Sequence, residues 1–199
     1  MQQVIPVLAF QWPRSLREFD QWMMAVTLPS ALPRWQRFAL EFLCFGIKEA
    51  RACLFAGLFF LAVFLLPRTV WLGVARYDWL LLFALAVQAW MVWTQLETWD
   101  ELKAISLFHV LGFALEVFKT SPAIGSWSSP DAGVSKLFGV PLFSGFMYAA
   151  VGSYLIQAWR LFDLRVEHHP PYWMASLMAL ALYANFFTHH FIGDHRWLL

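Results

Sequence analysis

The sequence predicts an all-α protein built as a polytopic bundle of about five transmembrane helices. Hydrophobic residues make up 60% of the 199-residue chain, charged residues make up 14%, and the mean hydropathy is +0.56. A soluble domain carries roughly 45–50% apolar and about 25% charged residues. The 12 Trp residues also suit a bilayer, because Trp and Tyr gather at its two interfaces. Long apolar segments also recur along the chain, which is the third indication of a transmembrane helix bundle.

Residues 1–40 are expected to form a cytoplasmic or interfacial arm, followed by a transmembrane helical domain over residues 41–199. Pro13, Pro29 and Pro33 interrupt the arm, and proline does not continue a helix interior. The arm has no early basic region and no small-residue cleavage site, so it is not expected to be a signal peptide.

Five apolar segments are the predicted spans, because a spanning helix needs about 20 mostly apolar residues. They are residues 42–66, 79–96, 102–118, 138–159 and 172–192. The first helical turns of the segment 42–66 carry charged side chains. The part of it that lies in the hydrocarbon core of the bilayer is therefore expected to start near Ala52. No strand is expected, since an open sheet edge in lipid would leave backbone groups unpaired. Residues 119–137, rich in Gly, Ser and Pro, are the one long loop.

Five spans would place the N-terminus and the C-terminus of the chain on opposite sides of a bacterial inner membrane. Lys and Arg are more frequent on the side of the N-terminal arm, which predicts a cytoplasmic N-terminus. No basic run is interleaved with aromatic residues, so no nucleic-acid partner is expected. The expected partners are the bilayer and an apolar or lipid substrate. The apolar ending Trp197-Leu198-Leu199 suggests that the chain is truncated before a further segment.

Ionisable residues inside a span are costly and mark function or pairing. His109, Glu116 and Lys119 fall on one face of the helix over 102–118. We expect Glu116 to be a catalytic acid–base group, with His109 as a further catalytic group and Lys119 near the substrate. The alternative is that Glu116 and Lys119, three residues apart, only neutralise each other near the membrane interface.

The helix over 138–159 carries small and polar residues on one side. Gly145 and Gly152 lie two turns apart and predict a tight packing seam, because small residues let helices approach closely in lipid. Ser144 and Tyr148 lie on the same side. We expect both to contact a substrate, with Tyr148 as a hydrogen-bond donor.

The last helix ends in a polar cluster. Tyr183, His190 and Asp194 lie near one line, whereas Asn185 and His189 lie near a second line roughly 120–140° away. A His190–Asp194 pair would fix the tautomer of the imidazole, which makes both candidate catalytic residues. Tyr183, Asn185 and His189 are candidate substrate contacts.

No cofactor is expected from these residues. The two adjacent histidines, His189 and His190, point about 100° apart on a helix, so one metal ion gripped by both is disfavoured. A single metal held by Glu116 with His189 or His190 stays an open alternative.

Three strings carry a family resemblance: FKTSPAIGSWSSP (118–130), FGVPLFSGFMYAAVGSY (138–154) and YANFFTHHFIGDHRW (183–197). They resemble the bacterial family called Domain of Unknown Function 817, from about residue 41 to the end of the chain. This resemblance implies a multi-pass membrane protein and implies no activity.

A second resemblance is to membrane-bound carotenoid hydratases and cyclases. Glu116, Gly125-Ser126-Trp127 and Gly139-Val140-Pro141-Leu142 follow in the order of that pattern. It implies that a carboxyl group protonates a polyene, with Trp127 at the substrate. The chain departs from the pattern, which has aromatic residues at both positions where Trp127 and Ser129 stand.

Three functions therefore remain open. The first is an intramembrane acid–base enzyme acting on a lipid or an isoprenoid or carotenoid-like substrate. The second is a proton-coupled transporter or carrier that uses His109 and Glu116 as a relay. The third is a membrane assembly protein without catalysis, in which the polar residues only join helices.

Overall fold

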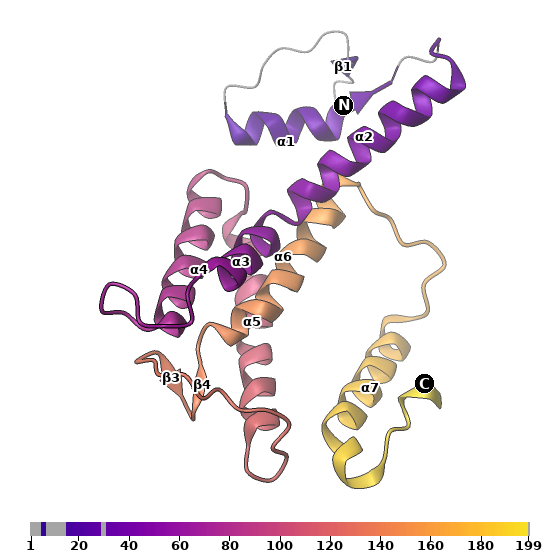
Figure 1. Cartoon of the computed structure of the whole chain (residues 1–199). Helices are drawn as coiled ribbons and strands as arrows, with labels where there is room; N and C mark the ends of the chain where they lie inside the picture. Colours follow the sequence, from indigo (N-terminus) through magenta and orange to yellow (C-terminus); the bar gives the residue numbers. More distant parts are fainter. Residues whose placement is uncertain (1–4, 7–14, 29–30, 199) are drawn as a thin grey trace. The chain divides into compact units, whose positions relative to one another are not determined.

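A computed structural model describes residues 5–6, 15–28 and 31–198. This part of the chain is mostly helical, with seven α-helices and four two-residue strands (Figure 1). The chain divides into two compact units, Met1–Leu164 and Arg165–Leu199. The all-α prediction is therefore confirmed at the level of secondary structure.

The first unit holds six helices: α1 (Leu16–Ala25), α2 (Arg34–Ala52), α3 (Leu54–Leu65), α4 (Arg76–Trp93), α5 (Trp99–Thr120) and α6 (Ser144–Leu161). Local sequence signals fix two of the helix starts. Ser15 caps α1 by accepting a hydrogen bond from the Glu18 amide. Thr98 and Glu101 form a capping box at the start of α5, which satisfies two backbone N–H groups that the helix itself leaves unpaired.

Short strands correct the expectation that no segment is extended. β1 (Ile5–Pro6) pairs in parallel with β2 (Val26–Thr27), and β3 (Lys136–Leu137) pairs antiparallel with β4 (Val140–Pro141). The β3–β4 turn is formed by Phe138 and Gly139, with φ of 54° and 80°. Two consecutive positive φ angles are what a two-residue hairpin requires.

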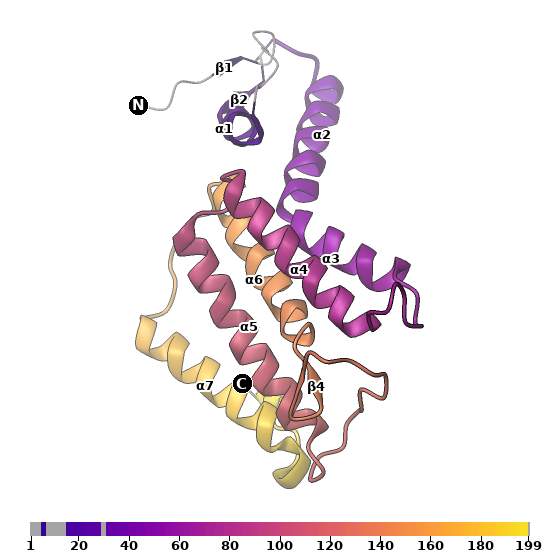
Figure 2. The ribbon, with the colours of Figure 1, turned by 90° about the vertical axis from the view of Figure 1, so that its left-hand side faces the viewer.

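The first predicted span, residues 42–66, is not one helix. It divides at Cys53, where α2 ends and α3 begins in a different direction (Figure 2). Just before this break, Arg51 donates to both carboxylate oxygens of Asp20 on α1. This buried charged pair anchors the end of α2 to α1.

The other predicted segments correspond to helices. Residues 102–118 fall within α5, and the segment 79–96 lies in α4 except for its last three residues, because α4 ends at Trp93. The segment 138–159 begins in the β3–β4 hairpin and becomes helical only at Ser144. Residues 172–192 coincide with α7 (Tyr172–Ile192). Within the described ranges, no helix combines the length and the apolar content that crossing a membrane requires, so the polytopic part of the prediction is not confirmed.

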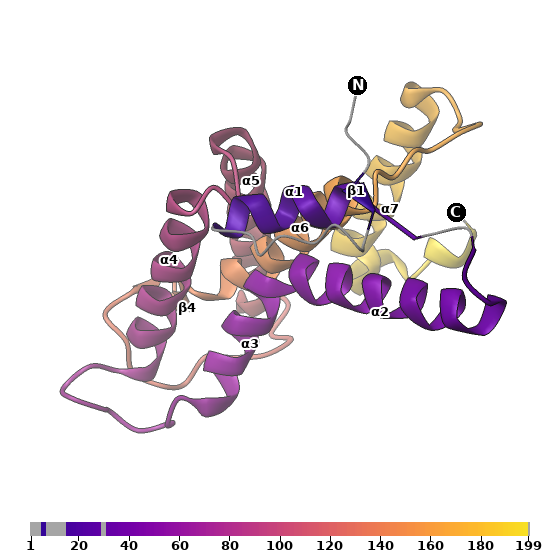
Figure 3. The same cartoon turned by 90° about the horizontal axis from the view of Figure 1, so that it is seen from above.

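The core of the first unit lies between α3, α4, α5 and α6. Its centre is a cluster of buried side chains that includes Phe55, Phe59, Met91 and Phe146. A smaller cluster of Met23, Ala52, Ala158 and Leu161 joins α1, α2 and α6, and Figure 3 shows α1 beside α2. The helix α2 continues through residue 40, the predicted end of the N-terminal arm, without a break.

α5 and α6 lie side by side (Figure 2) and meet at glycines. A Cβ at Gly145 would lie 2.8 Å from the backbone oxygen of His109, and one at Gly152 would lie 2.7 Å from the Phe108 ring. Real Cβ atoms are not found this close to other heavy atoms. The predicted glycine seam is therefore confirmed, and it brings the polar face of α5 against Tyr148.

The second unit consists of α7 and a 3-10 helix, η2 (Arg196–Leu198). Gly193, with φ of +86°, ends α7 in a conformation that favours glycine. The Asn185 side chain donates to the Gly193 oxygen at 3.0 Å and accepts from the His195 amide at 2.7 Å. Asn185 therefore holds the segment that follows α7 against the helix, and Figure 1 shows this segment turning back beside α7.

Candidate functional site

Glu116 receives hydrogen bonds from two other elements of the first unit. Its Oε1 atom accepts from the Tyr148 hydroxyl on α6 at 2.8 Å, and its Oε2 atom accepts from the Trp127 indole N–H at 2.9 Å. Only 5% of Glu116 is exposed. The structure thus brings together three residues predicted from the sequence, and we call them the Glu116 triad.

Local backbone features create this arrangement. Gly112 lies one turn before Glu116 on α5, and a Cβ there would overlap the Cβ and Cγ atoms of Tyr148. Trp127 follows a tight turn in which the Gly125 amide donates to the Ser121 oxygen at 2.8 Å and the Ser126 amide to the Lys119 oxygen at 2.9 Å. Gly125 has φ of +59°, so glycine suits this turn.

The other predicted residues of the first unit surround the triad or support it. Lys119 is buried one turn after Glu116 on α5. Ser144 is also buried, and its hydroxyl donates to the Pro141 oxygen at 2.8 Å, so it fixes the start of α6. The His109 ring packs on Phe146 with ring centroids 4.4 Å apart. Its Nδ1 atom is buried and has no hydrogen-bond partner among the described residues.

The predicted site residues on α7 belong to the second unit. The Nδ1 atom of His189 lies 2.8 Å from the Phe186 oxygen. The rings of His189 and His190 have centroids 3.9 Å apart, so their side chains meet although their Cα–Cβ directions diverge. Tyr183 is exposed, whereas Asn185 is buried.

Asp194 is engaged by a cation within the second unit. The Arg196 side chain donates to both Asp194 carboxylate oxygens, and the Arg196 amide donates to Oδ1 at 3.1 Å. The hydrogen bonds from the Arg196 side chain, followed by the one from its amide, hold the pKa of Asp194 below its usual range.

A metal centre built from several ligands is not seen in the described part of the chain. Among those residues, no group of three or more His, Cys, Asp or Glu side chains is placed to hold a metal ion.

Sequence reasoning missed a second buried carboxyl group, Glu97, in the turn between α4 and α5. It is 1% exposed, and it accepts hydrogen bonds from Gln88 and from Ser153 at 2.6 Å, with Gln157 at 3.4 Å. Burial raises the pKa of Glu97; the Ser153 and Gln88 hydrogen bonds oppose this shift, and the charge of Glu101 adds to it. Glu97 lies outside any periodic segment, so no helical pattern singles it out.

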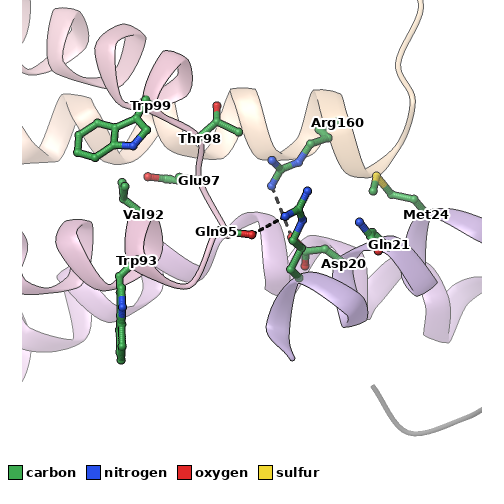
Figure 4. Close-up of a pocket in the computed structure, with 11 residues that line it drawn as sticks. Asp20, Gln21, Met24, Val92, Trp93, Gln95, Glu97, Thr98, Trp99 and Arg160 are labelled. Atoms are coloured by element: carbon green, nitrogen blue, oxygen red, sulfur yellow. Dashed lines mark hydrogen bonds and ion pairs between the residues drawn. The ribbon is translucent and has the colours of Figure 1, made fainter. Parts of the chain in front are cut away.

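An arginine network lies next to Glu97. Arg51 donates to both Asp20 oxygens at 2.8 and 2.7 Å, and Arg160 donates to the Leu96 oxygen at 2.7 Å and to Glu101 at 3.0 Å. Beside this network is a pocket of about 420 Å³ between α1, the α4–α5 turn and α6 (Figure 4). Arg51 and Arg160 are recognisable in the sequence only as cations near predicted membrane interfaces.

Comparison with known proteins identifies relatives of this chain. The "Uncharacterized protein YoaT" of Bacillus subtilis (strain 168) is 49% identical over 155 residues, which cover 78% of this chain and 58% of that protein. The chain thus spans less than two thirds of this relative's length. No solved structure matches significantly. The family model described as "Protein of unknown function (DUF817)" matches residues 41–199. The resemblance of the three sequence strings is therefore confirmed, and the chain belongs to the DUF817 family.

Proposed function

We propose that the chain is part of a membrane-embedded helical protein in which Glu116 transfers a proton to or from an apolar substrate of the lipid or isoprenoid class. The observation that carries this proposal is the Glu116 triad: a buried carboxyl group fixed at both oxygens by neutral donors. Buried polar groups with defined partners in a helical bundle are typical of functional sites.

The distribution of side chains supports an apolar environment. Large apolar residues are exposed on α2, α3, α5 and α6, among them Phe42, Phe64, Leu111 and Leu155. Several polar residues on α2, α5 and α6 are buried, namely Arg51, Glu116, Ser153 and Gln157. Soluble monomers rarely expose large contiguous apolar surface, so this inside-out distribution favours contact with lipid. The bacterial inner membrane and a cytoplasmic N-terminus remain part of this proposal.

The chemistry of the triad suits proton transfer. A carboxylate has about four lone-pair positions, and a neutral donor occupies one position on each oxygen. The remaining lone pairs can accept a proton, while the two donors hold the carboxyl plane in place. The Tyr148 hydroxyl is both a donor and an acceptor, so it can reverse its hydrogen bond when Glu116 becomes protonated.

Deuterium transfer tests the enzyme proposal. Membranes that contain the protein are incubated in D₂O with the lipid and isoprenoid extract of the host, and C–H deuteration is followed by mass spectrometry. We expect one apolar compound to gain deuterium with the wild type and to lose this gain with Glu116→Gln. Glu41→Gln removes an exposed carboxyl group on α2 and should leave the exchange unchanged. No deuteration with the wild type, or equal deuteration with Glu116→Gln, would contradict the proposal.

A proton carrier is the second candidate, favoured by the unpartnered Nδ1 atom of His109. His109 precedes Glu116 by seven residues on α5, roughly 10 Å along the helix axis. A relay through these residues predicts a pH-driven proton flux in sealed vesicles that both His109→Ala and Glu116→Gln abolish. If wild-type protein produces neither flux nor deuteration, an assembly role without chemistry replaces both candidates.

A further inference from the structure

The pocket beside Glu97 is a site that the Glu116 chemistry does not use. Its volume of about 420 Å³ lies within the range of roughly 300–1,000 Å³ typical of small-molecule sites. Figure 4 shows Trp93 and Trp99 at one end of the pocket and Asp20 and Arg160 at the other. An apolar end opposite a charged end indicates an amphiphilic ligand.

The carboxylates near this pocket are already engaged by protein donors. Arg51 donates to both oxygens of Asp20. Gln88 and Ser153 donate to the two oxygens of Glu97. Glu101 accepts from Arg160 and from the Thr98 amide. A cationic ligand would therefore compete with donors that these carboxylates already bind inside the protein.

Several guanidinium N–H donors near this pocket, by contrast, have no acceptor among the described residues. The exposed Arg17 guanidinium donates to Gln95 Oε1 at 2.5 Å and forms no ion pair in the described part of the chain. A guanidinium has five N–H groups, so most of its capacity remains open. Arg51 Nη1 and Arg160 Nε are buried and lack hydrogen-bond partners among the described residues. A ligand that supplies acceptors would complement the exposed Arg17 guanidinium, because guanidinium groups bind phosphate and carboxylate in a bidentate manner.

The other end of the pocket offers aromatic surface. Trp93 is 83% exposed and Trp99 is 71% exposed. Val92 also lines this end of the pocket, whereas Met24 lies at the end with Arg160 (Figure 4). An exposed indole combines a large apolar face with a polar N–H group, which suits the boundary between an alkyl chain and a polar head.

We propose that this pocket binds the anionic head of an amphiphile, a phosphate or carboxylate, with Arg17 contacting the head and Trp93 and Trp99 contacting the start of the apolar chain. The acidic residues hold Arg51 and Arg160 in place, so a cationic ligand would compete with these guanidinium groups for the same carboxylates. The site is distinct from the Glu116 triad. Amphiphile binding in this pocket and proton transfer at Glu116 can therefore be tested independently.

Native mass spectrometry of the full chain in a nonionic detergent tests the site with three probes: decyl phosphate, inorganic phosphate and decyltrimethylammonium. We expect one equivalent of decyl phosphate to bind, with much weaker binding of the other two. Arg17→Gln should weaken decyl phosphate binding about tenfold, because a charge-assisted hydrogen bond contributes roughly that factor. Arg68→Gln is the matched control, since Arg68 is an exposed arginine that does not line this pocket.

Further variants separate the parts of the proposal. Trp99→Ala should weaken decyl phosphate binding and leave that of inorganic phosphate unchanged, and Glu116→Gln should change neither. Arg17 is exposed, so its substitution should preserve the helical circular dichroism signal. Three results would overturn the proposal: preferential binding of decyltrimethylammonium, equal affinity for inorganic and decyl phosphate, or an unchanged affinity in a folded Arg17→Gln variant.

Discussion

The hydroxyl of Tyr148 on α6 donates a 2.8 Å hydrogen bond to Glu116 on α5, and it reaches this position because Gly112 leaves space for the tyrosine ring. Packing and the hydrogen bonding of Glu116 are therefore coupled at one place on the α5–α6 seam. A change in the seam should alter the Glu116 triad, and a change in the triad should alter the stability of the seam.

Gly112→Ala should destabilise the protein by about 1–3 kcal/mol, the typical cost of overpacking, because the new Cβ would overlap the Tyr148 ring. Thermal unfolding followed by circular dichroism measures the loss. The matched control is Gly57→Ala in α3, where a Cβ meets no atom within 4 Å. Alanine should stabilise that helix by roughly 0.5–1 kcal/mol. A neutral Gly112→Ala would mean that α5 and α6 are not packed this closely.

Tyr148→Phe removes one of the two donors to Glu116. The variant should lose about 1–3 kcal/mol of stability, the cost of leaving a buried acceptor unsatisfied, with Tyr172→Phe at an exposed position of α7 as the control. In combination with Glu116→Gln the loss should be less than the sum of the single losses, because the two residues share one interaction. Strict additivity would show that the hydrogen bond does not form.

Glu97→Gln should remove a pH dependence of stability. Burial raises the pKa of Glu97 above its ordinary value of 4.5, so the folded state binds the proton more tightly than the unfolded state. The wild type should therefore lose stability as the pH rises from about 4.5 through the raised pKa. The Gln variant should lack this decline. Its new side-chain amide can donate to the Oε1 atom of Gln88, which has no hydrogen-bond partner among the described residues. Denaturant unfolding at a series of pH values measures the effect.

Glu97→Ala completes that comparison. It removes the acceptor of the Ser153, Gln157 and Gln88 donors, so it should destabilise the protein by about 1–3 kcal/mol at all pH values. If the Ala and Gln variants behave alike, the buried hydrogen bonds to Glu97 do not contribute to stability.

Asp78→Ala should loosen the loop that carries Trp127. Asp78 at the start of α4 accepts from the Val134 and Ser135 amides at 3.0 and 2.7 Å. Hydrogen exchange at these two amides should become at least about tenfold faster, since a lost charge-assisted bond removes roughly that protection. Asp100→Ala, at an exposed position on α5, should leave both amides unchanged. Equal exchange in the two variants would show that Asp78 does not hold the loop.

The sequence predicted best where local signals decide the structure. The bounds of α7 follow from an apolar run between Pro171 and Gly193, and both residues interrupt helices for local steric reasons. The glycine seam also follows from helical spacing, as do the faces of α5 and α6 on which Glu116 and Tyr148 lie. Only the 3.6-residue period and the small size of glycine are needed for these predictions.

Contacts between distant segments could not be predicted in this way. Near the division of the first predicted span, Arg51 pairs with Asp20, 31 residues earlier in the chain. Glu97 is surrounded by partners from α4 and α6, up to 60 residues away. No period or motif connects these residues, so a single sequence contains no signal for the buried network or for the pocket beside it.

Selective chemical labelling can show whether Glu116 is a proton-exchanging carboxyl group that faces an apolar phase. A hydrophobic carbodiimide and a water-soluble one, applied separately to membranes containing the protein, both modify protonated carboxyl groups, and peptide mass spectrometry locates the adduct. The account predicts that the hydrophobic reagent modifies Glu116 and the water-soluble one does not, while exposed Glu41 shows no preference for the hydrophobic reagent. Equal modification of Glu116 by both reagents, or by neither, would contradict a proton-exchanging carboxyl group that faces an apolar phase.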